Sequence, residues 1–379
     1  MKERHLILFF TYGISLKIWD ETGLLDREIV LYKKLIKNGF KVCFITYGDE
    51  SDYHYQDKLG EIKIIPFYAF VKKPSNRILK FIQSFFLPVF LRNQLKEADI
   101  IKTNQMSTTW VPIFAKYMFK KKLVIRCGFE WYRSFIRLSN SKFIKIYLFV
   151  TELLSYNLAD AIIMTSHSDR EYIIKKFKIK KEKIAVIHNY VNTNFFIPLK
   201  IPKKENHLIF IGRLSYPKNL FNLLEALKGS YYTLDMIGDG ELKPDLEKYA
   251  LENNICVNFL GRFPNSKIPE LLNQYEVFIL PSYWEGNPKS LLEAMSCGLA
   301  IIGTDVDGIN NIIRHKENGY LCKTDSKSIR EAIDAVMADE LLRKRMGTQA
   351  REFIIRNCSI EEIIKKEIAI YNRLYEKVF

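Results

Sequence analysis

Two glutamates, Glu285 and Glu293, lie on either side of a strand-to-helix turn in the segment PSYWEGNPKSLLEAMSCG (281–298). The preceding run VFIL (277–280) has the composition of a short buried strand, and leucine and methionine recur at helical spacing after Pro288. Glu285 is therefore predicted on the loop at the carboxyl end of the strand, and Glu293 about one and a half turns into the helix. Two carboxylates in such different places are expected to do different work.

The start of this predicted helix is suited to bind an anion. Proline at the first helical position loses no needed donor, and we place Pro288 there. The backbone amides of the first turn, with Gly286 and Asn287 just before it, then form a cradle for phosphate. Open α/β sheets bind ligands at the carboxyl ends of their strands. The alternative is a solvated loop acid followed by an ordinary glutamate on a helix surface.

Several segments resemble the retaining GT-B glycosyltransferases of family 4 (glycosyl transferases group 1). EGNPKSLLEAMSCG, followed by LAIIGTDVDGINNIIRHKENGYLC, resembles the Glu-x7-Glu signature of that family. Upstream, IFIGRLSYPKNLFNLLEAL (209–227) resembles its phosphate-binding element and contains Arg213 and Lys218, while residues 236–263 resemble its middle segment. The resemblance implies a GT-B fold, with two Rossmann-like, doubly wound α/β domains facing a central cleft.

The resemblance also implies a reaction. A sugar would pass with retention from a nucleotide-sugar donor to a hydroxyl of a glycan or lipid-linked acceptor, in cell-surface polysaccharide or glycolipid synthesis. Two cationic side chains would neutralise the departing diphosphate, so neither a metal ion nor another cofactor is required. Glu285 would contact hydroxyls of the donor sugar and Glu293 those of the ribose; a double displacement through Glu285 is the less favoured route. The implied catalytic residues are Glu285, Arg213 and Lys218, and the implied donor-binding residues are Gly13, Gly286, Asn287, Pro288, Lys289, Ser290, Leu291 and Glu293.

The first half of the chain resembles the family only in part. Tyr12-Gly13 stands where the family often has a glycine pair, so Gly13 is either a point of close backbone approach to a phosphate or donor sugar or a simple turn. In LVIRCGFEWYRSF (123–135), Cys127 occupies the position of a sugar-contacting histidine in many members. Arg126, Cys127 and Glu130 are therefore candidates for the acceptor or donor-sugar side. Arg126 is equally suited to a structural ion pair.

Length and periodicity predict two α/β domains. The 379 residues suffice for two hydrophobic cores, and strand-like runs alternate with helical patterns in both halves. In the first half we predict strands at 5–10, 42–46, 63–66, 100–102, 123–126, 161–164 and 184–187. We predict an acceptor-side domain at 1–189, a linker at 190–206, a nucleotide-sugar-binding domain at 207–358 and a terminal helix at 359–379 that packs back toward the first domain.

Basic residues are concentrated in the first half. Residues 1–198 contain 33 Lys and Arg against 18 Asp and Glu, whereas the rest of the chain has 25 of each, so the first half carries the whole net charge of +15. This asymmetry indicates an anionic partner, such as a phospholipid surface, a lipid diphosphate acceptor or a nucleic acid. We find no recognised nucleic-acid-binding motif, and we do not expect a nucleic-acid partner.

The chain is expected to be cytoplasmic, with peripheral association at the inner face of the cell membrane. Its six cysteines have no spacing typical of zinc sites or disulfide frameworks. The apolar run near the N-terminus is too short for a signal peptide, and no apolar run is long enough to span a bilayer. Residues 72–96 and 142–159 mix lysines with apolar side chains and are open to two interpretations, membrane contact or packing on the sheet. Packing is favoured for the second segment, which Lys145 and Glu152 interrupt.

Two other functions are compatible with this architecture. One is a nucleotide-sugar epimerase, and the other is a catalytically silent partner subunit, which the departures from the family pattern at Cys127 and Tyr190 motivate. The Glu-x7-Glu pattern together with two suitably spaced cations favours sugar transfer over both.

Overall fold

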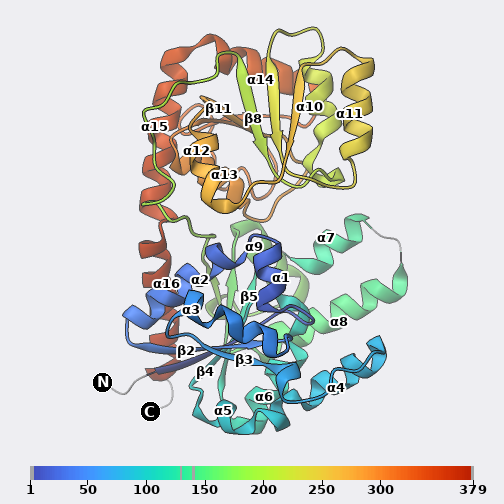
Figure 1. Cartoon of the computed structure of the whole chain (residues 1–379), viewed down its shortest axis with the longest axis vertical. Helices are drawn as coiled ribbons and strands as arrows, with labels where there is room; N and C mark the ends of the chain where they lie inside the picture. The colour runs from blue at the N-terminus through green and yellow to red at the C-terminus, as the bar shows by residue number, and fades with distance from the viewer. Residues whose placement is uncertain (1–3, 129, 139–140, 377–379) are drawn as a thin grey trace. The chain divides into compact units, whose positions relative to one another are not determined.

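The computed structural model describes residues 4–128, 130–138 and 141–376 and contains two compact units (Figure 1). The first unit is formed by the chain up to Ile187 and again from Ile364, and the second by His188–Ile363. Each unit is a parallel sheet flanked by helices. Both are therefore doubly wound α/β units of the predicted class.

The first unit has a seven-stranded sheet in the order β3-β2-β1-β4-β5-β6-β7. Its strands are β1 (Arg4–Phe9), β2 (Phe40–Thr46), β3 (Lys63–Pro66), β4 (Ile100–Thr103), β5 (Lys122–Cys127), β6 (Ala161–Met164) and β7 (Ile184–Val186). Its helices are α1 (Leu16–Glu21), α2 (Leu25–Lys37), α3 (Gln56–Leu59), α4 (Arg77–Phe90), α5 (Arg92–Glu97), α6 (Trp110–Phe119), α7 (Trp131–Leu138), α8 (Lys142–Leu158) and α9 (His167–Phe177). The strand predictions for this half are confirmed to within two residues.

The second unit has a six-stranded sheet in the order β10-β9-β8-β11-β12-β13. Its strands are β8 (His207–Ile211), β9 (Thr233–Ile237), β10 (Val257–Gly261), β11 (Val277–Leu280), β12 (Ala300–Thr304) and β13 (Tyr320–Cys322). Its helices are α10 (Leu220–Leu227), α11 (Lys243–Glu252), α12 (Ile268–Leu272), α13 (Lys289–Ser296), α14 (Ser326–Ala338) and α15 (Glu340–Asn357). The strand order reverses direction between β8 and β11, which is where open sheets of this kind bind ligands.

The sheets form because the central strands are buried on both faces and, apart from Lys102 and Thr103 at the end of β4, are largely apolar. Every residue of β4, β6, β11 and β12 is buried, as a parallel sheet with helices on both sides requires. These runs are rich in isoleucine and valine, whose branched side chains fit a pleated surface. Apolar composition thus fixes the strands, and the carboxyl ends of all strands in each sheet meet at one edge.

The predicted linker 190–206 belongs to the second unit. The Val191 amide donates to the carbonyl of Cys358 at 2.8 Å, and the Ile360 amide donates to the carbonyl of Val191 at 3.1 Å. Further along, the Leu199 amide donates to Asn273 Oδ1 at 2.7 Å. The segment is therefore held by hydrogen bonds to the second unit rather than crossing freely from one unit to the other.

The last helix, α16 (Ile360–Glu376), contributes a buried charge cluster to the first unit. Glu367 on this helix lies 2.7 Å from Lys102 Nζ and 3.7 Å from Arg126, and it accepts a 2.6 Å hydrogen bond from the Tyr371 hydroxyl. Although burial opposes the shift, the charges of Lys102 and Arg126 lower the pKa of Glu367. The two cations thus hold a fully buried carboxylate in its ionised form and fix α16 to strands β4 and β5.

The structure also bears on disulfide bonds and on membrane-spanning helices. The six cysteines form no disulfide with one another, and all six are among the described residues. Within the same residues, none of the helices has the length and apolarity that a bilayer crossing demands.

Candidate functional site

The Glu285 region lies at the reversal point of the second sheet. Glu285 follows β11 on the loop 281–287, and the loop after the neighbouring strand β8 leads through a 3-10 turn at Tyr216–Lys218 into α10. Because β8 and β11 are parallel neighbours, their carboxyl ends deliver both loops to the same edge. Lys218 and Glu285 are brought together there, although 67 positions separate them in the chain.

A short ion pair joins these two loops. Lys218 Nζ lies 2.5 Å from Glu285 Oε1, and the Ser282 hydroxyl donates to the same oxygen at 2.6 Å. Both side chains of the pair keep some solvent exposure, 18% for Lys218 and 12% for Glu285. Among the described residues the second carboxylate oxygen, Oε2, has no hydrogen-bond partner, and it can accept a hydrogen bond from a ligand hydroxyl.

Backbone hydrogen bonds hold the Glu285 loop from two sides. The Tyr283 amide donates to the carbonyl of Pro217 at 2.8 Å, and the Glu285 amide donates to the carbonyl of Asp307 at 3.1 Å. The Thr304 hydroxyl, at the end of β12, donates to the carbonyl of Ser282 at 2.5 Å. Three successive loops of the sheet are therefore bonded to one another, and the position of Glu285 is set by residues from β8, β11 and β12.

Gly308 allows the loop after β12 to approach this closely. Its φ is +84°, and a Cβ atom there would lie 2.3 Å from the carbonyl oxygen of Glu285 and 2.6 Å from that of Gly286. Only glycine fits both the backbone angle and the contact. Asn219, the residue after Lys218, adds another bond because its Nδ2 donates to the carbonyls of Pro281 and Thr324 at 2.9 and 2.8 Å.

Helix α13 begins at Lys289, one residue later than predicted. Pro288 is the N-cap, and its carbonyl accepts the first intrahelical bond from the Leu292 amide at 3.3 Å. Proline has no amide proton. It suits the N-cap as well as the first helical position, because the amide at either position donates no hydrogen bond within the helix. The amides of Lys289, Ser290 and Leu291 belong to the first turn, ahead of that first bond, which is where a helix binds an anion.

Asn287 and Lys289 are tied to the start of the second unit. Asn287 Oδ1 accepts from the Asn189 amide at 2.7 Å, and Asn189 Nδ2 donates to the Asn287 carbonyl at 2.7 Å. Lys289 Nζ lies 5.6 Å from the ring centroid of Tyr190, within cation–π range. The ring of Tyr190, which departs from the family pattern, thus packs against the side chain of the first residue of α13.

The remaining predicted groups of the second unit differ in exposure. Arg213 is exposed on the loop after β8, and its guanidinium makes no hydrogen bond or ion pair with the rest of the described chain. It is therefore available to a ligand phosphate. Glu293 lies inside α13 and keeps only 6% exposure, so a ligand must come to the helix to reach it.

Gly13 lies in the first unit, at the carboxyl end of β1, and belongs to the corresponding edge of that sheet. Its φ is +76°, and an added Cβ would meet no protein atom within 4 Å. The Ile14 amide donates to the carbonyl of Thr11 at 2.9 Å, which closes a tight turn around the glycine. The turn geometry therefore requires glycine, and the space in front of it is open within this unit.

The three candidates of the first unit at the end of β5 do not face solvent. Cys127 is fully buried and contacts the Tyr156 hydroxyl at 3.8 Å, so its thiol cannot reach a sugar in this conformation. Arg126 is turned to Glu367, which corresponds to the structural ion pair left open by the sequence. Glu130 is 1% exposed and accepts a hydrogen bond from the Arg133 amide at the start of α7. All three hold structure in place instead of presenting groups to a ligand.

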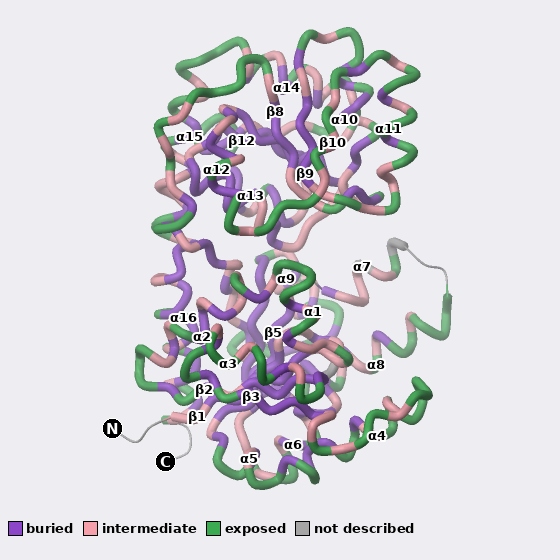
Figure 2. The backbone as a smooth tube through the Cα atoms, viewed as in Figure 1, coloured by how far each residue is buried: buried purple, intermediate pink, exposed green. Residues whose placement is uncertain are grey.

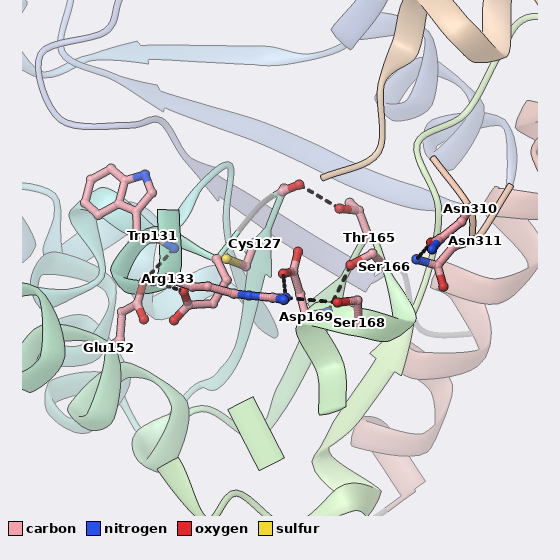
Figure 3. A network of polar contacts seen from close by, with 12 residues as sticks. Cys127, Trp131, Arg133, Glu152, Thr165, Ser166, Ser168, Asp169, Asn310 and Asn311 are labelled. Carbon is pink, nitrogen blue, oxygen red and sulfur yellow. Dashed lines mark hydrogen bonds and ion pairs between the residues drawn. The ribbon is translucent and has the colours of Figure 1, made fainter. Parts of the chain in front are cut away.

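Glu130 belongs to a buried acidic pair with Glu152 of α8. Glu152 Oε1 accepts from the amides of Trp131 and Tyr132 at 3.0 and 3.1 Å, and Arg133 reaches across to Ser168 and Asp169 in α9 (Figure 3). Burial, followed by the neighbouring Glu130, raises the pKa of Glu152 to about 10. Burial also raises the pKa of Glu130. The pair therefore retains a proton at neutral pH.

Several residues of the site were not predicted. Ser282, Asp307, Gly308 and Asn219 position Glu285 and Lys218, yet none was assigned a role from the sequence. Ser282 precedes Glu285 by three residues, so its proximity was the available signal. The other contacts join segments far apart in the chain, and spacing gives no indication of them.

Two doubly wound parallel sheets in one chain are the architecture of the GT-B class of folds. Residues 29–195 match the family model described as Glycosyltransferase Family 4, and residues 191–353 match the one described as Glycosyl transferases group 1. Together with glycosyltransferase relatives, these matches support a glycosyltransferase with the GT-B fold.

Some of the related enzymes are named for lipid-linked sugars. The chain is 30% identical over 243 residues to the Escherichia coli UDP-Gal:alpha-D-GlcNAc-diphosphoundecaprenol alpha-1,3-galactosyltransferase. This match covers 58% of the present chain and 62% of that enzyme. A Campylobacter jejuni alpha-1,4-N-acetyl-D-galactosaminyltransferase acting on a diphosphoundecaprenol-linked sugar is 26% identical over 346 residues, or 87% of this chain and 90% of the enzyme. With the first of these enzymes, the match extends over less than two thirds of the relative's length.

Solved structures share the fold over nearly the whole chain. Sucrose-phosphate synthase from Thermosynechococcus elongatus has a TM-score of 0.78 at 19% identity and covers 99% of this chain and 100% of its own. Anabaena HepE in complex with UDP has a TM-score of 0.78 at 17% identity, with 97% and 100% coverage. At such identities the likeness establishes the architecture alone.

Gly308→Ala is expected to displace Glu285 and lower sugar transfer by at least tenfold. The new Cβ would collide with the Glu285 carbonyl, and the backbone that carries the carboxylate must move. Transfer rate and thermal unfolding midpoint would be measured together. Gly229→Ala is the matched control, since Gly229 also has a positive φ, +67°, but has nothing within 4 Å of the added atom. Equal activity of the two variants would show that the contact with Glu285 does not matter.

Glu152→Gln is expected to raise stability at alkaline pH. The folded pKa of Glu152 is about 10 and its ordinary value is 4.5, so wild-type stability falls as pH rises through this interval. The free energy of unfolding of the wild type falls by at most ~1.4 kcal/mol per pH unit from this group. Glutamine does not titrate and keeps an oxygen for the amides of Trp131 and Tyr132. Unfolding midpoints of wild type and Glu152→Gln measured from pH 5 to 9 should diverge as pH rises. Glu171→Gln, at an exposed position of α9, should follow wild type. Parallel curves for Glu152→Gln and wild type would contradict the assignment.

Proposed function

We propose that the protein is a retaining glycosyltransferase of hexosyltransferase type. It moves a sugar from a nucleotide-sugar donor to a hydroxyl of a glycan or lipid-linked acceptor, in cell-surface polysaccharide or glycolipid synthesis. The observation that carries the proposal is the Lys218–Glu285 pair at the carboxyl ends of β8 and β11, with Arg213 exposed on the loop after β8. A carboxylate, two cations and a set of amides at the same sheet edge suit a sugar diphosphate.

In the proposed mechanism the second unit stabilises the leaving group. The amides of Lys289, Ser290 and Leu291 donate hydrogen bonds to diphosphate oxygens, and Arg213 and Lys218 neutralise the charge that develops as the bond to the anomeric carbon breaks. Lys218 carries three donor protons, so it can bind a phosphate oxygen and still hold Glu285. These fixed cations supply the neutralisation that a metal ion would otherwise provide, and no metal is required.

The acceptor hydroxyl attacks from the face that the diphosphate leaves. The bond from the acceptor oxygen to the anomeric carbon forms as the bond to the phosphate oxygen breaks, and that phosphate oxygen takes the hydroxyl proton. Configuration is retained without a covalent enzyme intermediate. Glu285 presents Oε2 to hydroxyls of the donor sugar as positive charge builds on the ring, because Oε1 is already bound to Lys218 and Ser282.

Relatives suggest the class of each substrate. The Escherichia coli relative is named for UDP-Gal and a diphosphoundecaprenol-linked acceptor, and structures of Anabaena HepE contain UDP, UDP with glucose, or UDP-glucose. We therefore propose a uridine diphosphate sugar as donor and a lipid diphosphate-linked sugar as acceptor. The basic first half of the chain is suited to the acceptor's phosphates and to an anionic membrane, so we place the enzyme at the cytoplasmic face of the membrane.

Binding and product analysis test this function. The purified protein should be stabilised against thermal unfolding by UDP or a UDP-sugar more than by guanosine or adenosine diphosphates. With a lipid diphosphate-linked acceptor, NMR of the product should show the anomeric configuration of the donor, and transfer should continue in EDTA. Isomerisation of the donor when incubated alone would instead indicate an epimerase. Failure to bind any nucleotide would indicate a silent subunit.

Glu285→Gln and Glu293→Ala are expected to separate turnover from binding. Glu285→Gln should lower kcat by about 10²–10³ and leave nucleotide affinity nearly unchanged, since charge is lost where it stabilises the transition state. Glu293→Ala should weaken nucleotide binding by about tenfold to a hundredfold, the cost of a hydrogen bond to a charged acceptor. Calorimetry and transfer kinetics would measure both. Exposed Glu270→Gln is the control, and unchanged kcat in Glu285→Gln would remove that residue from the chemistry.

A further inference from the structure

The first unit exposes an unusual number of large apolar side chains on two helices. Eight such side chains of α4 and six of α8 are exposed, and both helices are largely green and pink in Figure 2. Phe143 on α8 is 82% exposed and Ile78 on α4 is 68% exposed. Scattered apolar residues are ordinary on a protein surface, but a contiguous set of this size marks an interaction site.

A hollow of about 170 Å³ connects the two helices through α6. Phe81 and Phe85 line it from α4, Trp110 and Ile113 from α6, and Tyr147 and Leu154 from α8. Phe81 and Phe85 also pack against the Trp110 ring, at centroid distances of 5.2 and 6.2 Å. Exposed residues of both α4 and α8 thus line one apolar slot, and we call this slot, with the exposed apolar side chains of the two helices, the α4–α6–α8 face.

Helix α8 packs on the first unit as favoured from the sequence, but only with part of its surface. Tyr156 belongs to the core, Phe149 and Leu153 pack against it, and the buried residues of α8 are Leu148, Glu152, Ser155 and Tyr156. The buried Glu152 bonds to the amides that begin α7, so the charge that interrupts the apolar pattern points inward. The outward side of α8 is left without an exposed acid.

Charge on this face has one sign. Residues 71–96, which include α4, contain six Lys and Arg residues and no Asp or Glu. Residues 105–128, which include α6, likewise contain no acid and have the run Lys120–Lys122, whereas Lys116 of α6 is paired with Asp160 at 2.9 Å. At the exposed start of α8, Lys142 stands beside Phe143. Apolar side chains flanked by cations and free of exposed acids match the boundary of an anionic bilayer, where headgroups meet hydrocarbon.

We propose that the α4–α6–α8 face docks on an anionic phospholipid bilayer. Its aromatic and aliphatic side chains enter the headgroup boundary, and its lysines and arginines meet lipid phosphates. The inference rests on the proposed function, since a lipid-linked acceptor offers its sugar only at the headgroup layer. A second copy of the chain fits this face less well, because a symmetric contact would bring like charges together.

Vesicle binding of the full chain tests the face directly. Flotation would use vesicles of phosphatidylcholine alone and of phosphatidylcholine with 30% phosphatidylglycerol, at 0.1 and 0.5 M salt. We expect binding to the anionic vesicles, little to the neutral ones, and at least a fivefold loss at high salt. The double variant Phe86→Asp/Phe143→Asp should lose at least tenfold in binding. Leu251→Asp is the matched control, since Leu251 on α11 is also 82% exposed.

Two further measurements separate the docking face from the enzyme. Transfer to a water-soluble acceptor should be the same in wild type and the double variant, and their unfolding midpoints should agree. Active wild type that does not float with anionic vesicles, or a double variant that floats as well as wild type, would overturn docking and leave the function standing. Vesicle binding with no transfer to any acceptor would overturn the function alone. A wild-type dimer that the double variant converts to monomer would assign the face to a second copy and overturn the proposal.

Discussion

The ion pair between Lys218 and Glu285 is the contact on which the candidate site depends. It joins the loops that follow β8 and β11, the two strands between which the sheet order reverses, and Ser282 fixes the same carboxylate oxygen. With Oε1 occupied in this way, the side chain has little freedom and Oε2 has a defined direction. Pre-organisation of this kind lowers the cost of binding, because the loops are ordered before a ligand arrives.

The local sequence pattern was sufficient to predict where the strands lie and where the two glutamates of the acidic motif stand. Buried parallel strands such as β11 are short apolar runs, and the helix that follows has its own period, so VFIL and the leucines after Pro288 fix where Glu285 and Glu293 stand. The partners of Glu285 could not be obtained in this way. Asp307 and Gly308 come from the loop after the next strand, and the closeness of that loop follows from sheet order, which no local spacing encodes.

The first unit shows a different limit of sequence reasoning. A motif position at the end of β5 identifies the residue but not the direction of its side chain, since neighbours along a strand point to opposite faces. Cys127 enters the core beside Tyr156, while Arg126 meets Glu367, which the chain supplies about 240 residues later. Glu130 finds a second carboxyl in α8. Each partner comes from a distant element. The side chains of Arg126, Cys127 and Glu130 were candidates for ligand contact because they are polar, but they are buried and contact other parts of the protein instead.

Charge is used differently in the two units. The half of the chain after residue 198 has equal numbers of acidic and basic residues, so its candidate anion site relies on where Arg213, Lys218 and the α13 amides stand and not on net charge. The first half carries the full +15, of which Lys102 and Arg126 are buried with Glu367. Exposed charges act over roughly a Debye length, about 10 Å at 0.1 M salt. The remaining cations can therefore attract an anionic surface, whereas recognition of a single diphosphate requires the fixed contacts of the second unit.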